Sequence, residues 1–124
     1  MNTYRILVTG SRNWDDTDTI CDALDHAVET AIARGHEPVL VVGDCSTGAD
    51  RIAYRWARAA RVPTNVHIAN WHDHGKAAGP RRNTAMVGSG ADICLAFIRN
   101  SSRGASHTVR LAERAGIPVQ RWTA

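Results

Sequence analysis

The chain has 124 residues, of which 44% are hydrophobic and 22% are charged. That length allows one domain with a single core, and the apolar fraction excludes a disordered chain. No apolar run approaches the roughly twenty residues that cross a bilayer, and the N-terminal residues lack a signal-peptide pattern. We therefore expect residues 1–124 to form one cytoplasmic domain that makes no contact with a membrane.

Charge is distributed unevenly along the chain. The net charge is +3, but residues 76–124 carry eight Lys or Arg against two Asp or Glu, whereas residues 1–75 carry seven against ten. A basic region of this kind suits an anionic small molecule or a nucleic acid. A solvated basic face that binds nothing is the alternative.

The cysteines and histidines match neither a disulfide framework nor a metal site. Cys21, Cys45 and Cys94 are widely spaced and form no Cys-x-x-Cys pair, so we expect buried or partly buried free thiols. His72 and His74 have one Asp nearby and no clear third ligand. The sequence therefore predicts neither a bound metal nor a cofactor.

Strand-like and helix-like segments alternate, which is typical of an α/β fold with a parallel sheet and helices on both faces. In the first half, apolar runs, caps and glycines predict a strand over 4–9, a helix from Asp16 to Gly35, a strand over 38–42, a helix from Gly48 to Ala60 and a strand over 64–69. In the second half, residues 70–79 are too irregular for either element. Pro80 then opens a short helix to about Val87, and a strand over 91–98, a helix over 104–115 and a strand over 117–122 follow.

Because crossovers between parallel strands are right-handed, few arrangements of five strands remain. We expect a three-layer Rossmann-like fold with a parallel five-stranded sheet of order 3-2-1-4-5. The strand order reverses between the first and fourth strands, and open sheets bind ligands in the crevice at such a point, at the carboxyl ends of the strands. Four loops should meet there.

The loop after the first strand contains Gly10, Ser11, Arg12 and Trp14. Glycine allows a tight turn close to a ligand, Ser11 can donate from its hydroxyl and amide groups, and Arg12 can pair with a phosphate. The Gly-x-Gly-x-x-Gly fingerprint is absent, since only Gly10 is present, so a conventional NAD dehydrogenase is not expected. A plain strand-to-helix turn is the alternative.

The loop after the second strand, residues 43–50, suits an anion because its small residues leave the amides of the following helix exposed. Asp44 can accept hydrogen bonds from ribose hydroxyls, and Asp50 either contacts a ligand or completes a capping box with Thr47. Cys45 has no evident His or Asn partner for nucleophilic catalysis. The candidate ligand contacts of this loop are Gly43, Gly48, Ala49 and Asp50.

Residues 71–83 form the most unusual stretch of the chain. Lys76, Arg81 and Arg82 surround a helix start, whose free amides add partial positive charge and favour a phosphate. Trp71 can stack on a base or be buried in the core. The candidate ligand contacts here are Trp71, His74, Lys76, Gly79, Arg82 and Asn83.

The fourth loop, residues 97–108, again combines Ser, Gly and the amides of a helix start, which suit a phosphate. Ser101 and Ser102 can equally be simple helix caps. The candidate ligand contacts are Gly104, Ser106, His107 and Thr108.

Together these segments resemble a known family. The motifs are Gly10-Ser11-Arg12-x-Trp14-x-Asp16, Gly43-x-x-x-x-Gly48-Ala49-Asp50-Arg51-x-Ala53, Trp56-Ala57, His74-Gly75-Lys76-Ala77-Ala78-Gly79, Arg82-Asn83-x-x-Met86 and Gly116-Ile117-Pro118-Val119. Over essentially the whole chain they are similar to the YspA-like, cpYpsA-related branch of the SLOG superfamily, whose members are common in actinobacteria and their phages. The resemblance implies a Rossmann-like fold, a homodimer and the binding of nucleotides or nucleotide-derived ligands.

The same superfamily includes the Lonely Guy phosphoribohydrolases, which cleave the N-glycosidic bond of nucleoside monophosphates, and a DNA-processing protein that binds single strands. Arg82-Asn83-x-x-Met86 matches the hydrolase motif Arg-Lys-x-x-Met, so Arg82 takes the functional Arg position. The hydrolase loop Gly-Gly-x-Gly-Thr-x-x-Glu is not matched, because alignment on Gly104 places Thr108 at the catalytic Glu. The missing carboxylate would have to come from Asp44, Asp50 or Glu113.

Three functions follow from these patterns. The converging phosphate loops and the replaced Glu favour a sensor or ligand-binding protein that holds a nucleotide or nucleotide-derived ligand without turnover. The alternative is a nucleoside 5′-monophosphate phosphoribohydrolase, with Arg82, Asp44 and Asp50 as catalytic candidates. A second alternative is a single-stranded nucleic-acid binding module, which the basic second half favours and the scarcity of aromatic residues opposes.

Overall fold

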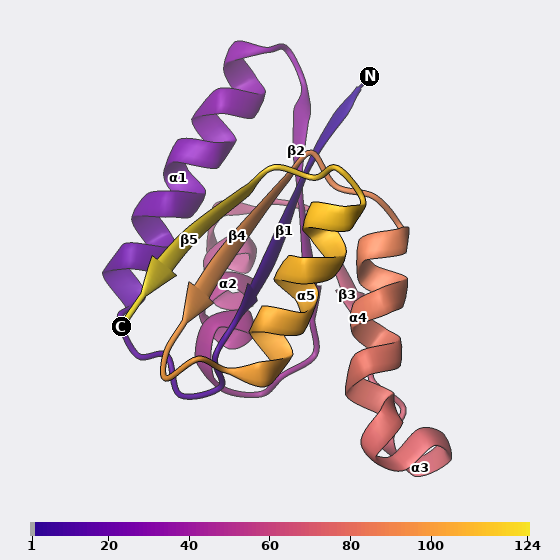
Figure 1. Ribbon diagram of the computed structural model, residues 1–124. Coiled ribbons are helices and arrows are strands. Elements are labelled where there is room, and N and C mark those ends of the chain that lie inside the picture. Colours follow the sequence, from indigo (N-terminus) through magenta and orange to yellow (C-terminus); the bar gives the residue numbers. More distant parts are fainter. Residues whose placement is uncertain (1) are drawn as a thin grey trace.

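The computed structural model describes residues 2–124, in which five strands alternate with helices (Figure 1). The first half contains β1 (Thr3–Gly10), α1 (Thr17–Ala33), β2 (Glu37–Gly43), α2 (Gly48–Ala60) and β3 (Thr64–His67). The second half contains α3 (Trp71–His74), the 3₁₀ turn η1 (Gly75–Ala77), α4 (Ala78–Gly88), β4 (Ile93–Ile98), α5 (Arg103–Arg114) and β5 (Val119–Thr123). Within this described part of the chain, no helix has the length and apolar character that crossing a membrane requires.

The strands form one parallel sheet of order β3-β2-β1-β4-β5. On the central strand β1, Val8 pairs with Val42 of β2 and with Leu95 of β4. Helices α1 and α2 cover one face of the sheet, and α4 and α5 cover the other (Figure 1). The predicted Rossmann-like α/β fold and strand order are confirmed. Because the connections leave β1 and β4 toward opposite faces, a crevice opens where these two strands end.

The central strands are apolar on both sides because helices cover both faces. Ile6 and Val8 of β1 pack in the core cluster with α1 and α2, whereas Leu7 packs in the cluster with α4 and α5. The residues of α2 that face the sheet are small and fully buried: Ala49, Ala53 and Ala57. Their small side chains allow α2 to approach the sheet closely, which brings its first turn against the loop after β1.

The structure differs from the predicted elements on either side of β3. This strand ends at His67 instead of Ala69, and residues 70–79, predicted to be irregular, are largely helical. The side chain of Asn70 caps α3 by accepting a hydrogen bond from a backbone amide at 3.1 Å, a local signal that apolar periodicity does not reveal. Helix α4 also begins earlier than predicted, so Pro80 lies inside its first turn, where a missing N–H is tolerated.

The structure contradicts the predicted capping box of α2 and agrees with the predicted state of the cysteines. The capping box at the start of α2 is not formed, because Thr47 makes no side-chain cap hydrogen bond and Asp50 accepts one from the backbone N–H of Cys45. The prediction of free, at least partly buried thiols is confirmed for Cys21, Cys45 and Cys94.

Candidate functional site

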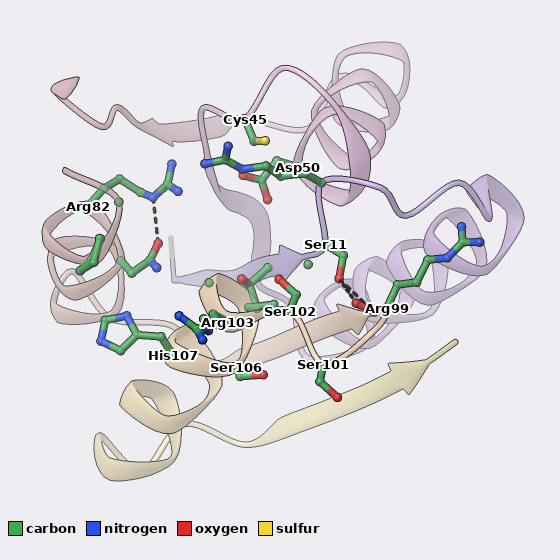
Figure 2. A pocket seen from close by; sticks show the side chains of 18 of the residues that line it. Ser11, Cys45, Asp50, Arg82, Arg99, Ser101, Ser102, Arg103, Ser106 and His107 are labelled. Carbon is green, nitrogen blue, oxygen red and sulfur yellow. Dashed lines mark hydrogen bonds between the residues drawn. The ribbon is translucent and has the colours of Figure 1, made fainter. Parts of the chain in front are cut away.

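A cavity of about 1100 Å³ lies at the carboxyl ends of the strands (Figure 2). Its wall is formed by the loops after β1, β2 and β4, by α3 and α4, and by the first turns of α5. The predicted site residues found in the wall are Gly10, Ser11, Arg12, Asp50, Trp71, Gly79, Arg82, Asn83, Gly104, Ser106 and His107. The four predicted loops therefore meet at one place, and the cavity is large enough for a nucleotide.

The other predicted site residues lie outside the cavity wall. Trp14 is buried in the core, where its ring meets Phe97 edge-on and its Nε1–H donates to the carbonyl of Asp16. Thr108 is also buried, and its hydroxyl donates to the carbonyl of Gly104 in the same helix. The remaining residues outside the wall are Gly43, Asp44, Gly48, Ala49, His74 and Lys76.

Gly43 and Gly48 lie outside the cavity wall, but the space that their missing side chains leave is needed by residues of the wall. A Cβ atom on Gly48 would collide with the carbonyl oxygen of Ser11, and the φ of Gly48 is +70°, so only glycine allows α2 to start directly against the β1 loop. A Cβ atom on Gly43 would lie 2.5 Å from Nη1 of Arg82 and 2.8 Å from Oδ2 of Asp50. Gly43 therefore leaves the space that these two side chains occupy.

Positive charge dominates the cavity wall. Asp50 is the one carboxylate found there, beside five arginines: Arg12, Arg82, Arg99, Arg103 and Arg110. Arg82 pairs with Asp44 at 2.8 Å and Arg99 with Asp15 at 3.0 Å. Among residues 2–124, the other three guanidinium groups have no carboxylate partner. The cavity is thus suited to an anion.

Arg82 is held in place by its neighbours. Its Nε donates to Oδ1 of Asn83 at 2.9 Å and its Nη1 to Oδ1 of Asp44 at 2.8 Å. The second oxygen of Asp44 accepts a hydrogen bond from the N–H of Ala69 at 3.3 Å. Asp44, interpreted from the sequence as a ribose contact, therefore orients Arg82 and ties the segment before α3 to the end of β2.

Ser11 is almost fully buried, and its polar groups already have partners. Its N–H donates to the carbonyl of Phe97 at 2.9 Å. Its Oγ accepts from the N–H of Arg99 at 2.7 Å and lies 3.1 Å from the carbonyl oxygen of Arg99, to which it donates (Figure 2). These contacts hold the β1 loop against the β4–α5 loop, whereas the sequence suggested that the same donors face a ligand.

The side chain of Asp50 lies in the cavity wall (Figure 2). It is buried, with 8% of the residue exposed. Burial raises its pKa to about 6, although the positive charge of Arg82 and the hydrogen bond from the N–H of Cys45 act in the opposite direction. A carboxyl group that titrates close to neutral pH can accept or release a proton during a reaction.

The start of α5 faces the cavity without a side-chain cap. Ser102 occupies the N-cap position but makes no cap hydrogen bond with its side chain, so the first amides of the helix remain available to a ligand. Arg103, Ser106 and His107 of the first turns line the cavity (Figure 2). The Nδ1 atom of His107 is buried and has no hydrogen-bond partner within residues 2–124.

Trp71 lies at the rim of the cavity, with 49% of its surface exposed. The guanidinium carbon of Arg12 lies 5.8 Å from the ring centroid. A Cβ atom on Gly79 would lie 3.4 Å from the ring, so this glycine allows α4 to pass close to the indole. Of the two alternatives predicted for Trp71, core burial is wrong, and an exposed ring is available for stacking.

Sequence reasoning missed part of the wall. Arg99, Arg103 and Arg110 line the cavity but were not among the predicted contacts. Arg103 and Arg110 are seven residues apart on one helix, a spacing that places them on the same face two turns apart, so this signal was present in the sequence. Nothing in the sequence separates Arg99 from an ordinary loop residue.

Comparison with known proteins agrees with this architecture. The profile of the YspA, cpYpsA-related SLOG family matches residues 4–74. The chain belongs to this family. It is also 45% identical over 120 residues to the gene 61 protein of Mycobacterium phage D29, and the match covers 93% of each chain. The SLOG profile includes the loops after β1 and β2, whereas Arg82 and α5 lie beyond the matched residues.

Proposed function

We propose that this protein binds a nucleotide or a nucleotide-derived phosphorylated ligand in the cavity, as a sensor or ligand-binding protein. The observation that carries the proposal is a wall with five arginines, one carboxylate and the uncapped start of α5. Guanidinium groups and free helix amides stabilise a phosphoryl group, and they do so most strongly where water is partly excluded. Membership of the SLOG family supports a nucleotide-related ligand.

Two parts of the wall suit two parts of such a ligand. The start of α5, with Arg103 and Ser106, suits the phosphoryl group. The exposed ring of Trp71 offers a stacking surface for the base. A nucleotide would use both parts, whereas inorganic phosphate or ribose 5-phosphate would use only the first.

The first experiment is a thermal-shift panel of nucleoside mono-, di- and triphosphates and dinucleotides. A ligand that binds the folded state raises the Tm by mass action, and we expect at least one member of the panel to do so. Arg103→Gln should remove most of that shift. Arg103 lies at the positive end of the α5 dipole, where a cation is unfavourable, so its loss should not destabilise the fold.

Arg114→Gln is the matched control, because Arg114 lies in the last turn of the same helix and outside the cavity wall. This variant should respond to the ligand as the unsubstituted protein does. If no nucleotide raises the Tm, or if both variants respond equally, the proposal is wrong.

A second function, hydrolysis of the N-glycosidic bond of a nucleoside 5′-monophosphate, is favoured by Asp50. Its buried carboxyl group, with a pKa raised to about 6, is ionised at neutral pH and can act as a general base. The water oxygen would bond to the anomeric carbon while the bond to the base breaks. One water proton would pass to Asp50, which would then release it through solvent to the departing base, so that the products are ribose 5-phosphate and the free base and the Asp50 carboxylate is restored.

This function is tested by incubating the protein with nucleoside monophosphates and measuring ribose 5-phosphate and free base. Asp50→Asn should abolish release. Glu113→Gln should leave it unchanged, because the Glu113 carboxylate pairs with Arg121 away from the cavity. If the protein binds nucleoside monophosphates but releases no ribose 5-phosphate, only the first proposed function, ligand binding, remains. If Asp50→Asn still hydrolyses the substrate, Asp50 is not the base.

A further inference from the structure

A row of three nitrogen-bearing side chains follows α5 on the side that lines the cavity. Its members are Arg103, His107 and Arg110, and all three belong to the cavity wall. Arg103 and Arg110 share one face of the helix and lie two turns apart, which is about 10 Å along the helix axis. The row therefore continues well beyond the start of α5, where Arg103 and Ser106 suit one phosphoryl group.

No acidic side chain compensates this row. Arg103 and Arg110 are exposed, and neither pairs with a carboxylate among residues 2–124. Helix α4 packs beside α5 (Figure 1) and contributes another part of the cavity wall, yet it contains no Asp or Glu. Residues 99–112 contain none either. The charge of the row is therefore left for a bound anion to neutralise.

The positive charge of the cavity exceeds what one phosphoryl group can balance. Two of the five arginines in the wall have carboxylate partners. This leaves Arg12, Arg103 and Arg110, and within the described part of the chain Asp50 is the carboxylate that faces them. The amides at the start of α5 add partial positive charge. A phosphate monoester carries at most about two negative charges, so a second anionic group improves the balance.

The cavity also has room for a longer ligand. Its volume of about 1100 Å³ lies above the range of roughly 300–1,000 Å³ that is usual for small-molecule sites. A base stacked on Trp71 and a single phosphoryl group at the start of α5 would leave Arg110 without an anionic partner. A phosphate chain that continues along the row would contact Arg103 and Arg110 together.

We propose that the ligand carries at least two linked phosphoryl groups, as a nucleoside diphosphate does, one beside Arg103 at the start of α5 and one beside Arg110. This inference rests on the first proposed function, because it assumes that the cavity binds a nucleotide. A dinucleotide joined through a pyrophosphate has the same linked groups. It lacks the additional charge of a terminal phosphoryl group, so the charge balance favours the nucleoside diphosphate.

Calorimetric titration of nucleoside mono- and diphosphates that share one base tests this. Adenine, guanine, cytosine and uracil are compared in turn, in buffer with EDTA so that no metal ion bridges the phosphates. With at least one base, the diphosphate should bind about tenfold more tightly than the monophosphate, since one added charged contact has this order of magnitude. Diadenosine diphosphate is the dinucleotide probe, and it should bind less tightly than the best nucleoside diphosphate.

Arg110→Gln should remove most of the difference between mono- and diphosphate. It should not unfold the protein, because the Arg110 side chain is exposed and has no carboxylate partner within residues 2–124. Arg114→Gln is the matched control, since it removes the same charge one turn further along α5 and outside the cavity wall. This control should keep the full difference, which excludes a general attraction between a basic protein and a more highly charged ligand.

The inference is overturned if the monophosphate binds as tightly as the diphosphate with every base. It is also overturned if Arg110→Gln and Arg114→Gln reduce the difference equally, or if diadenosine diphosphate binds most tightly. In each of these cases a nucleotide still binds, so the first proposed function stands. If no nucleotide binds, that function and this inference are both wrong.

Discussion

Asp44 holds the guanidinium group of Arg82 at 2.8 Å with one carboxylate oxygen and accepts the N–H of Ala69 at 3.3 Å with the other. One side chain thus connects the end of β2, the segment before α3 and the wall of the cavity. Because Arg82 is fixed before a ligand arrives, less conformational freedom is lost on binding. The position of the Arg82 guanidinium group therefore depends on its contact with Asp44.

The first prediction concerns the stability that this pair provides. The side chain of Arg82 is only 12% exposed, so Asp44→Ala should lower the free energy of unfolding by about 1–3 kcal/mol. Asp44→Asn should lower it less, because an amide oxygen can still accept from Ala69. Urea denaturation at pH 7 measures both changes.

The exposed pair between Arg121 and Glu113 is the control for this comparison, since both side chains are about half exposed. Glu113→Ala should change the free energy of unfolding by less than about 1 kcal/mol. Equal losses from Asp44→Ala and Glu113→Ala would contradict the prediction.

The second prediction separates binding from folding with two glycine substitutions. In Gly43→Ala the new methyl group meets the ends of Arg82 and Asp50, which can move aside. Because Arg82 would have to shift away from Asp44, we expect a modest fall in Tm and a loss of nucleotide affinity of about tenfold, since the loss of one charged contact has this order of magnitude. In Gly10→Ala the methyl group meets the carbonyl oxygen of Phe97 at 2.6 Å, so the backbone itself must shift and the Tm should fall strongly.

Thermal denaturation and ligand titration of the two glycine variants distinguish these effects. If Gly43→Ala binds the ligand normally, the positions of Arg82 and Asp50 do not determine affinity. If Gly10→Ala is as stable as the unsubstituted protein, the close approach of α2 and β4 to the β1 loop tolerates a side chain.

The third prediction concerns the contact between Ser11 and Arg99. Ser11→Ala removes the hydroxyl that accepts the partly buried N–H of Arg99 at 2.7 Å, and it leaves that donor without its partner. We expect a loss of about 1–3 kcal/mol in the free energy of unfolding, measured by urea denaturation. Ser106→Ala, also in the cavity wall, should have little effect on stability. A Ser11→Ala variant as stable as Ser106→Ala would show that the two loops are held together by other contacts.

The fold could be predicted because its signals are local and repeated. Strands β1 and β2 end at glycines and helix N-cap residues follow β3 and β4, and alternating segments with right-handed crossovers leave few topologies. The segment 70–79 could not be predicted in the same way, because α3 depends on the cap of Asn70 and not on an apolar stripe. Short elements of this kind are decided by single hydrogen bonds and by tertiary contacts.

The position of the cavity was also predictable, whereas the contacts of individual residues were not. The convergence of four loops follows from the strand order alone. Whether an aromatic residue of a loop points inward depends on packing, so the buried Trp14 and the exposed Trp71 could not be told apart from the sequence. The ion pair between Arg82 and Asp44 could not be predicted from the sequence either, because the two residues are distant in the chain and meet only in the folded structure.

The fourth prediction concerns Asp50 and pH. The pKa of this carboxyl is about 6 in the folded protein and near its ordinary value of 3.8 when exposed. The folded state therefore holds the proton to a higher pH, so the associated stability is fully present below about pH 4 and is lost as the pH rises through 6. Asp50→Asn cannot ionise and should lack this decline, which we expect to be on the order of 2–3 kcal/mol between pH 4 and pH 7.

Urea denaturation of both proteins at pH 4, 5, 6 and 7 provides the comparison. Other groups titrate equally in the two proteins, so the difference between their curves isolates Asp50. If the free energy of unfolding of the two proteins changes with pH in the same way, the Asp50 carboxyl titrates as it does in water. Asp50 would then not be a candidate for the base.

The fifth prediction tests whether Trp71 contacts the base of the ligand. Removal of a stacking ring costs about 1–3 kcal/mol per base, so Trp71→Ala should weaken nucleotide binding by about fivefold to a hundredfold. Affinity for ribose 5-phosphate, which has no base, should stay the same, and Trp71→Phe should retain most of the nucleotide affinity. Isothermal titration calorimetry measures each combination. If Trp71→Ala loses affinity equally for both ligands, the ring supports the cavity wall from its position beside Gly79 and does not stack on a base.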